Sequence, residues 1–186
     1  MHQLHCHPSA AAPAVDGVSV SLDWAADGRL LLRYLLLGRP EALRLPAVEA
    51  HPGRRDNLWQ HTCCEAFLAG GPGTAYREFN FSPSGHWASY DFADYRTPAG
   101  AAPQGTGDAG PAPVIATIPG VAGLEIAVAL PPELLPPAEA EWMLGLSVVV
   151  EAADGSKSYW ALAHPGPQPD FHDRAAFVAR LAAPLL

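Results

Sequence analysis

Basic residues are scarce in this sequence. Its 186 residues include 11 Lys and Arg against 19 Asp and Glu, which gives a formal net charge of −8 at pH 7, and Lys157 is the one lysine. A surface that binds nucleic acid needs clustered Lys and Arg to neutralise phosphates. The composition therefore excludes a nucleic-acid partner.

Long apolar runs are also missing. The most apolar segments are interrupted at Arg33, Pro119, Glu125 and Pro131, well short of the roughly 20 residues that a helix needs to cross a membrane. The first eight residues, MHQLHCHP, lack the basic start and apolar stretch of a secretory signal, although a signal removed earlier would leave no trace. We expect no membrane association and a cytoplasmic location.

Cysteine is rare, and its number is odd. The three cysteines are Cys6, Cys63 and Cys64, and neighbours such as Cys63 and Cys64 point to opposite faces of a strand. No disulfide framework is expected from this arrangement, so all three thiols should be reduced.

Helical periodicity is nearly absent, whereas short apolar segments bounded by Gly and Pro recur along the whole chain. Apolar residues make up 49% of the chain and charged residues 16%, enough to build a core despite 20 prolines and 17 glycines. We predict one domain, residues 1–186, folded as an all-β, two-sheet antiparallel β-sandwich of immunoglobulin-like or jelly-roll type. The predicted strands are residues 3–7, 18–24, 30–36, 43–45, 61–69, 75–82, 86–92, 114–118, 124–130, 142–151, 158–163 and 177–182.

The connections carry turn signals. Residues 26–28 and 154–156 contain Asp-Gly, which is typical of hairpin tips because glycine accepts a positive φ. Residues 131–135 and a cap at Asp173 predict one or two short helical turns. The segment 97–113 is rich in Gly, Ala and Pro and is predicted to be a long mobile loop.

The best-defined hairpin spans residues 76–92. With residues 82–85 as its turn, Asn80 should lie opposite Trp87 and share a face with Glu78, while Tyr90 points to the core. An aromatic plane beside hydrogen-bonding side chains is what a sugar site needs. The alternative is that Trp87 fills an apolar layer.

A second pair of residues depends on the register of the preceding strand. If Leu68 faces Ala75, Glu65 lies opposite Glu78, with Cβ atoms roughly 5 Å apart. Two such carboxylates repel unless one is protonated or a cation or donor-rich ligand lies between them. The pair is a candidate site, although a one-residue slip would separate it into solvated side chains without a role.

Several segments together resemble a known family, the bacterial DOMON-like domains, in the superfamily of family-nine carbohydrate-binding modules and DOMON haem or sugar domains. The segments are residues 54–67 (RRDNLWQHTCCEAF), 78–85 (EFNFSPSG), 158–162 (SYWAL), 164–165 (HP) and 169–172 (PDFH).

This resemblance implies a β-sandwich with a non-catalytic ligand-binding role. In the carbohydrate modules a tryptophan, a glutamate shortly after it and a late aromatic embrace the sugar; these match Trp59, Glu65 and Trp160. The family's acidic pair after the tryptophan is replaced by His61 and Thr62, which argues against its calcium chemistry.

Rival interpretations remain open. The haem branch of the superfamily implies a methionine ligand, and Met143 is the one candidate besides the initiator; its strand reads as core, so no cofactor is expected. Close carboxylates would suit a retaining glycosidase, but no activated nucleophile is evident, so an enzyme is not expected. A structural or protein-interaction module, with its partner unknown, is the main alternative.

Histidines late in the chain also suggest a metal. Imidazole and carboxylate groups are ligands for zinc and similar ions, but their spacing matches no compact motif, and no metal is predicted. The residues concerned are His61, His164, Asp170 and His172.

Our prediction for function is a shallow site that binds a small neutral polar ligand, above all a saccharide. The predicted site residues are Trp59, Glu65, Glu78, Asn80, Trp87, Trp160 and His164.

Overall fold

The computed structural model describes residues 1–10, 13–71, 73–100, 110–137 and 140–184. In this part of the chain the fold is all-β, and helical structure is limited to short 3-10 turns. The strands are β1 (His2–Cys6), β2 (Gly17–Trp24), β3 (Leu30–Leu37), β4 (Cys63–Ala69), β5 (Tyr76–Phe81), β6 (Trp87–Asp94), β7 (Thr97–Pro98), β8 (Val114–Gly120), β9 (Gly123–Leu130), β10 (Glu141–Glu151), β11 (Lys157–Ala161) and β12 (Ala179–Ala182). The turns are η1 (Pro40–Ala42), η2 (Leu58–Gln60), η3 (Pro132–Leu134) and η4 (Arg174–Ala176).

All strand pairings are antiparallel and form one 12-stranded sheet in the order β7-β6-β5-β4-β10-β11-β1-β2-β3-β9-β8, with β12 paired to β10. The connection between its two halves is β1. His2, Gln3 and Leu4 pair with β2, whereas His5 and Cys6 pair with β11. The all-β antiparallel class is confirmed. Two separate sheets are not, because the hydrogen bonding continues through β1.

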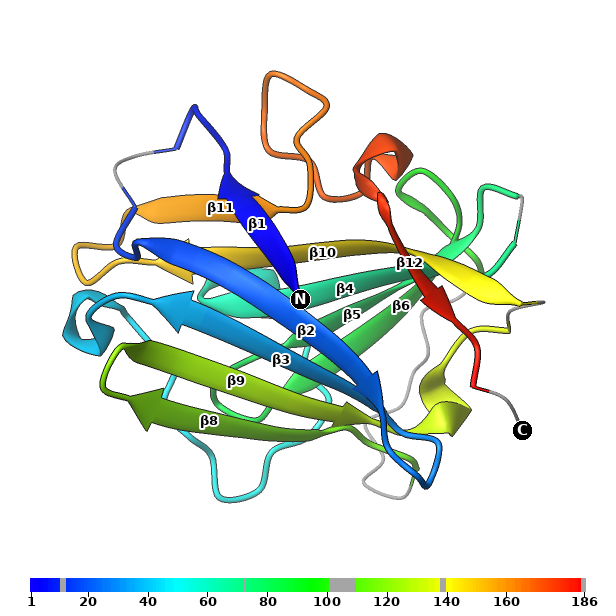
Figure 1. The fold of residues 1–186 in the computed structure, drawn as a ribbon, viewed down its shortest axis with the longest axis horizontal. Helices are drawn as coiled ribbons and strands as arrows, with labels where there is room; N and C mark the ends of the chain where they lie inside the picture. The colour runs from blue at the N-terminus through cyan, green and yellow to red at the C-terminus, as the bar shows by residue number, and fades with distance from the viewer. Residues whose placement is uncertain (11–12, 72, 101–109, 138–139, 185–186) are drawn as a thin grey trace.

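The continuous sheet folds over so that its halves lie one in front of the other (Figure 1). β2, β3, β8 and β9 form the front layer, and β4, β5, β6 and β10 form the back layer. A buried cluster joins them, with Val18, Leu32 and Ile126 from one layer and Phe79 and Leu146 from the other. Because each of these strands alternates, one face of each layer is apolar and supplies this core.

One buried hydrogen bond also crosses between the layers. The Tyr34 hydroxyl, on β3, donates to the backbone carbonyl of Glu65, on β4, at 3.0 Å. Tyr34 is fully buried, so this bond satisfies a hydroxyl that the core would otherwise leave unpaired. It also ties β4 to the front layer.

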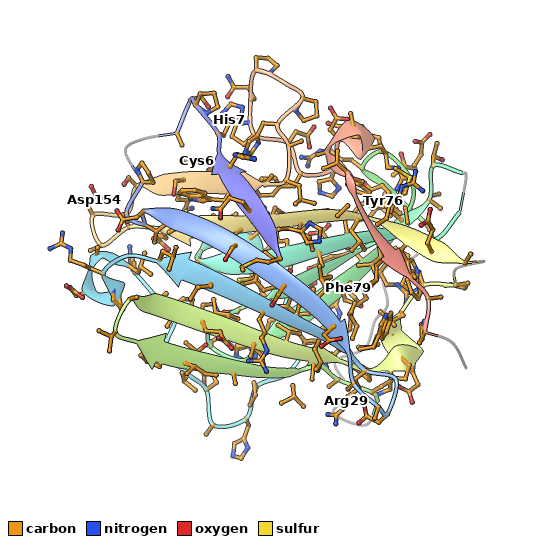
Figure 2. The ribbon with its side chains drawn as sticks, in the orientation of Figure 1. Cys6, His7, Arg29, Tyr76, Phe79 and Asp154 are labelled. Atoms are coloured by element: carbon orange, nitrogen blue, oxygen red, sulfur yellow. The ribbon has the colours of Figure 1, made fainter. Side chains whose placement is uncertain are left out.

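A second apolar cluster lies on the other face of the back layer. It contains Phe67, Tyr76 and Phe177, and Figure 2 labels Tyr76 of this cluster and Phe79 of the main core, both on β5. Gly145 makes room for it, because a Cβ there would lie 2.7 Å from Cδ1 of Phe177. The chain after β11 is thereby held over this face.

Most predicted strands form, but residues 43–45 do not form one. Leu43 makes an isolated bridge to Ala152, because the flanking segment lies across the end of β10 without a second paired residue. β7 falls inside the predicted loop 97–113, of which residues 101–109 lie outside the described residues.

No described helix has the length and apolar character needed to span a membrane.

The predicted turns are confirmed. Gly28 and Gly155 have φ of 82° and 85° at two hairpin tips, and Asp154 marks the second of these tips in Figure 2. Asp173 caps η4 by accepting a hydrogen bond from the backbone of Ala175 at 2.9 Å. The three cysteines are free.

Candidate functional site

The β5–β6 hairpin has a register one residue away from the predicted one. Ser82 donates its backbone N–H to the His86 carbonyl at 2.9 Å, so the loop has three residues and ends at Gly85 with φ of 92°. Phe81 therefore lies opposite Trp87 and Glu78 opposite Tyr90. The predicted pairing of Asn80 with Trp87 is wrong, because an extra loop residue turns every β6 side chain to the other face.

The β4–β5 register differs from the prediction by two residues. Leu68 pairs with Arg77 rather than Ala75, which places Glu65 opposite Asn80. The predicted direct pairing of Glu65 with Glu78 is therefore wrong. A two-residue shift preserves the face, so the two carboxylates lie diagonally across β4 and β5 on the outer face of the back layer.

A pocket of about 700 Å³ opens over this outer face. Its lining comes from β4, β5, β6, β10 and β11 below, and from three connecting segments around the rim. The lining residues are Asp56, Asn57, Trp59, Glu65, Glu78, Tyr90, Phe92, Arg96, Val149, Tyr159, Pro169, Phe171 and His172.

Two rim residues have positive φ, a backbone conformation that residues other than glycine seldom adopt. Asn57 has φ of 63° and Arg96 has φ of 49°, the two non-glycine residues with positive φ among those described. Asn57 is the N-cap of η2, the turn that presents Trp59, a residue that is 52% exposed. Strained backbone of this kind is concentrated at binding sites, and both instances here line one pocket.

Glu65 lies on the floor of the pocket with 3% of its surface exposed. One of its oxygens, Oε2, accepts a hydrogen bond from the Ser147 hydroxyl at 3.3 Å. Among the described residues none donates to Oε1. Burial, and then the neighbouring Glu78, raise the pKa of Glu65 well above its ordinary value.

Glu78 is also buried, and burial raises its pKa. Its Oε1 accepts a hydrogen bond from the Asn80 amide at 2.6 Å. The other oxygen, Oε2, lies 3.6 Å from Nε2 of His172. Burial, and then Arg96, lower the pKa of His172 to about 4, so this imidazole is neutral at pH 7 and forms no ion pair with Glu78.

Hydrogen bonds around His172 favour one tautomer. The Tyr76 hydroxyl accepts from the Arg96 backbone N–H at 3.2 Å and lies 2.8 Å from Nδ1 of His172. A hydroxyl that accepts from Arg96 is free to donate to Nδ1, which leaves the proton of neutral His172 on Nε2. This N–H faces Glu78 beyond hydrogen-bond distance.

The rim is held together by Asp170. Its Oδ1 accepts from Nη2 of Arg96 at 2.9 Å, and its Oδ2 accepts from the Tyr95 hydroxyl at 2.6 Å. The loop after β11 is thus tied to the β6–β7 turn, and the direct ion pair of Arg96 is with Asp170. At longer range, the charge of Arg96 also lowers the pKa of Glu65 and of Glu78, against the larger upward effect of burial.

The structure brings together some of the predicted site residues and separates others. Trp59, Glu65 and Glu78 line the pocket, and Asn80 lies beneath it, bonded to Glu78. His164 is not among the lining residues, because its ring Nε2 bonds the backbone carbonyl of His5 at 2.8 Å.

Trp87 and Trp160 belong to the core face and are not among the residues that line the pocket. Trp87 packs against the main core, and Trp160 is buried within it with 5% exposure. Tyr159 pairs with Val149 across β10 and β11 and points into the pocket instead. Alternation along a strand defines two faces without saying which of them is outward.

Sequence reasoning missed the other lining residues. Correct alternation in β6 would have found Tyr90 and Phe92, whose parity matches Glu78. Phe171 and His172 belong to the segment PDFH that the family resemblance had singled out. The sequence around Arg96 contains no pattern that predicts a position in the pocket, because this position depends on the β6–β7 turn.

The four predicted metal-ligand candidates have separate partners. His61 lies 2.8 Å from Glu151, and His164, Asp170 and His172 make the contacts given above. Across the described ranges no group of three His, Cys, Asp or Glu side chains could hold a metal ion. Met143 packs beside the second apolar cluster.

Fold and site together define an antiparallel all-β protein with one large pocket of aromatic and carboxylate side chains on its outer face. No protein-family model matches the chain, and comparison with curated proteins finds no match. A solved structure with a similar fold is a protein from Bacteroides uniformis ATCC 8492, whose assignment as carbohydrate-binding is provisional. The TM-score is 0.61 at 14% identity, over 89% of this chain and 78% of that one.

Proposed function

We propose that this protein binds a saccharide in the pocket over Glu65 and Glu78 and does not turn it over. The observation that carries the proposal is the joint lining of one cavity by aromatic rings and buried hydrogen-bonding groups. Sugars present apolar C–H faces and outward hydroxyls, so they need both kinds of contact.

The dimensions of the pocket fit this class of ligand. Its volume of about 700 Å³ lies within the ~300–1,000 Å³ typical of small-molecule sites. The aromatic walls are supplied by Trp59, Tyr159 and Phe171, while Glu65 and Glu78 offer acceptors at the floor. Trp59 has no aromatic partner among the described residues and is half exposed, so its indole face is free to stack on a sugar ring.

The scaffold is consistent with the same proposal. We regard the two packed layers as a β-sandwich whose sheets are joined through β1, in keeping with the DOMON-like and family-nine resemblance. The Bacteroides protein with the similar fold carries a provisional carbohydrate-binding assignment, which supports a sugar ligand for this fold without identifying it.

Binding without turnover is supported by the positions of the carboxylates. Glu65 and Glu78 lie on neighbouring strands of one floor, so they approach a ligand from the same side. Glycosidases place an acid and a nucleophile or base on either side of the scissile bond. A sugar bound here should be released unchanged.

Isothermal titration against a panel of mono- and disaccharides tests the proposal. We expect a dissociation constant on the order of micromolar to millimolar for at least one sugar, since stacking and hydrogen bonds must offset desolvation. Trp59→Ala should weaken binding about tenfold or more, and Trp59→Phe, which keeps a ring, should weaken it less.

The control variant is Glu125→Gln, which removes a carboxylate paired with Arg33 on the front layer and should leave affinity unchanged. Absence of binding by any saccharide at millimolar concentration would reject the proposal. So would a sugar whose affinity is the same for wild type and Trp59→Ala. Release of a cleaved product from an oligosaccharide would reject the non-catalytic role.

A further inference from the structure

The charges in the pocket do not balance. Of the three lining carboxylates, Asp56 is compensated by Arg54 at 3.0 Å. The lining guanidinium, Arg96, is compensated by Asp170 at 2.9 Å. The remaining pair, Glu65 and Glu78, has no lysine or arginine within salt-bridge distance among the described residues.

This imbalance lies in the most buried part of the pocket. Glu65 and Glu78 are 3% and 6% exposed, and the imidazole beside them, His172, is neutral at pH 7. Ionised carboxyl groups at such depth are unfavourable without a cation or several donors. Either one of the two carboxyl groups holds a proton, or a bound cation compensates both.

Each of these two pocket-lining carboxyl groups has one oxygen that accepts no hydrogen bond from the described residues. Ser147 occupies Oε2 of Glu65, and Asn80 occupies Oε1 of Glu78. Glu65 Oε1 and Glu78 Oε2 therefore remain as acceptors, one from each of two neighbouring strands. A primary ammonium group has three donors and can reach two acceptors at once.

The walls also favour positive charge. Aromatic faces attract cations that lie within about 6 Å of the ring centroid, and the pocket already shows this contact, because Arg54 lies 5.4 Å from the ring centroid of Tyr90. Trp59, Tyr159 and Phe171 provide further rings around the opening. An anionic ligand would instead meet two carboxylates and an arginine that is already paired.

We propose that the pocket seats a primary ammonium group of its ligand between Glu65 and Glu78, so that the preferred ligand is an amino sugar rather than a neutral one. This inference rests on the proposed saccharide function and specifies the ligand class. The free oxygens of the two glutamates receive the ammonium protons, and the rim aromatics cover the sugar ring.

Other titratable and charged groups face this seat from every side of the pocket. Tyr159 faces it from β11, Tyr90 from β6 and Asp56 from the segment before η2, while Arg96 and His172 face it from the rim. Among the lining residues Arg96 opposes a cation, and its ion pair with Asp170 weakens that opposition. Arg54, outside the lining, is paired with Asp56 at 3.0 Å.

The experiment compares three sugars of similar size: glucosamine, glucose and N-acetylglucosamine. Titrations at pH 6.5 keep an amine of pKa about 8 in its ammonium form. We expect glucosamine to bind at least tenfold more tightly than either neutral sugar. Glu65→Gln and Glu78→Gln should each reduce the ratio of glucosamine to glucose affinity toward one, and Glu125→Gln should leave this ratio unchanged.

The outcomes separate this inference from the saccharide function. Equal affinity for all three sugars would overturn the ammonium seat and leave the saccharide function standing. Binding of n-butylammonium but of no sugar, lost in Glu65→Gln, would support the seat and reject the saccharide function. If neither sugars nor n-butylammonium bind, both are rejected.

Discussion

The side-chain amide of Asn80 donates a 2.6 Å hydrogen bond to Oε1 of Glu78, two residues earlier on the same strand. Asn80 also lies directly opposite Glu65 across β4 and β5, and its own oxygen accepts a contact from Sγ of Cys63 at 3.6 Å. One buried amide thus holds one carboxylate and adjoins the other. It leaves Oε2 of Glu78 without a hydrogen-bond donor among the described residues.

Replacing this amide should affect both binding and stability. Asn80→Leu keeps the volume but leaves Glu78 Oε1 buried without its donor, which is expected to destabilise the fold by about 1–3 kcal/mol. The freed carboxylate should also bind ligand about tenfold more weakly. Urea unfolding and isothermal titration measure the two effects, and a variant with wild-type affinity would show that Asn80 does not orient Glu78.

Alternation in the sequence was enough to find the strands but not their faces. The β5–β6 loop has three residues because Gly85 accepts a positive φ, whereas a two-residue loop would have placed Trp87 beside Glu78. Proline and glycine are compatible with both loop lengths. A single residue therefore decided whether Trp87 or Tyr90 faces the pocket.

The same limitation applies late in the chain. Tyr159 and Trp160 are neighbouring aromatics on β11, and either could face outward on sequence grounds. Trp160 points inward because Val148, its partner across β10, belongs to the core. By contrast, Glu65 and Glu78 were found together because polar residues within apolar strands stand out.

The rim could not be predicted, because long-range contacts of loops have no local sequence pattern. Arg96 reaches its position through Asp170, 74 residues further along the chain. His172 bonds Tyr76 across 96 residues. Such contacts depend on the finished sheet, which brings the β6–β7 turn and the loop after β11 to the same side.

Substitution of Trp160 should lower stability without changing affinity, whereas substitution of Trp59 should weaken binding with little change in stability. Trp160→Phe removes volume from the core and the donor that bonds the Ser158 hydroxyl at 3.0 Å, so it should cost about 1–3 kcal/mol of stability without changing affinity. Trp59→Ala alters an exposed side chain and should change stability by less than about 0.5 kcal/mol. Thermal unfolding with titration tests this, and a loss of affinity in folded Trp160→Phe would mean the pocket is misassigned.

His172 should make the fold less stable in acid. Its folded pKa of about 4 lies below the ordinary 6.5, so stability from the neutral imidazole is fully present above pH 6.5 and is lost as pH falls toward 4. The unfolded chain takes up a proton there that the folded protein excludes. Allowing for solvent in the pocket, we expect roughly 2 kcal/mol lost by pH 4.

The variant His172→Asn lacks this titration. Its free energy of unfolding, relative to that of wild type, should rise as pH falls from 6.5 to 4. Urea unfolding at half-unit pH steps measures the difference, and groups common to both proteins cancel in it. A difference independent of pH would mean that His172 titrates normally in the folded protein.

Glu65 should change the pH dependence of stability in the direction opposite to His172. Because its folded pKa is raised above the ordinary 4.5, its contribution is fully present below pH 4.5 and is lost as pH rises through the folded pKa. Glu65→Gln does not titrate, so its stability relative to wild type should increase between pH 4.5 and 8. At pH 6.5, saturating glucosamine should make wild type more stable to unfolding than Glu65→Gln. Only wild type offers the ammonium group a carboxylate at this position. Parallel unfolding curves for Glu65→Gln and wild type across this range would show that Glu65 ionises as readily in the pocket as in the unfolded chain.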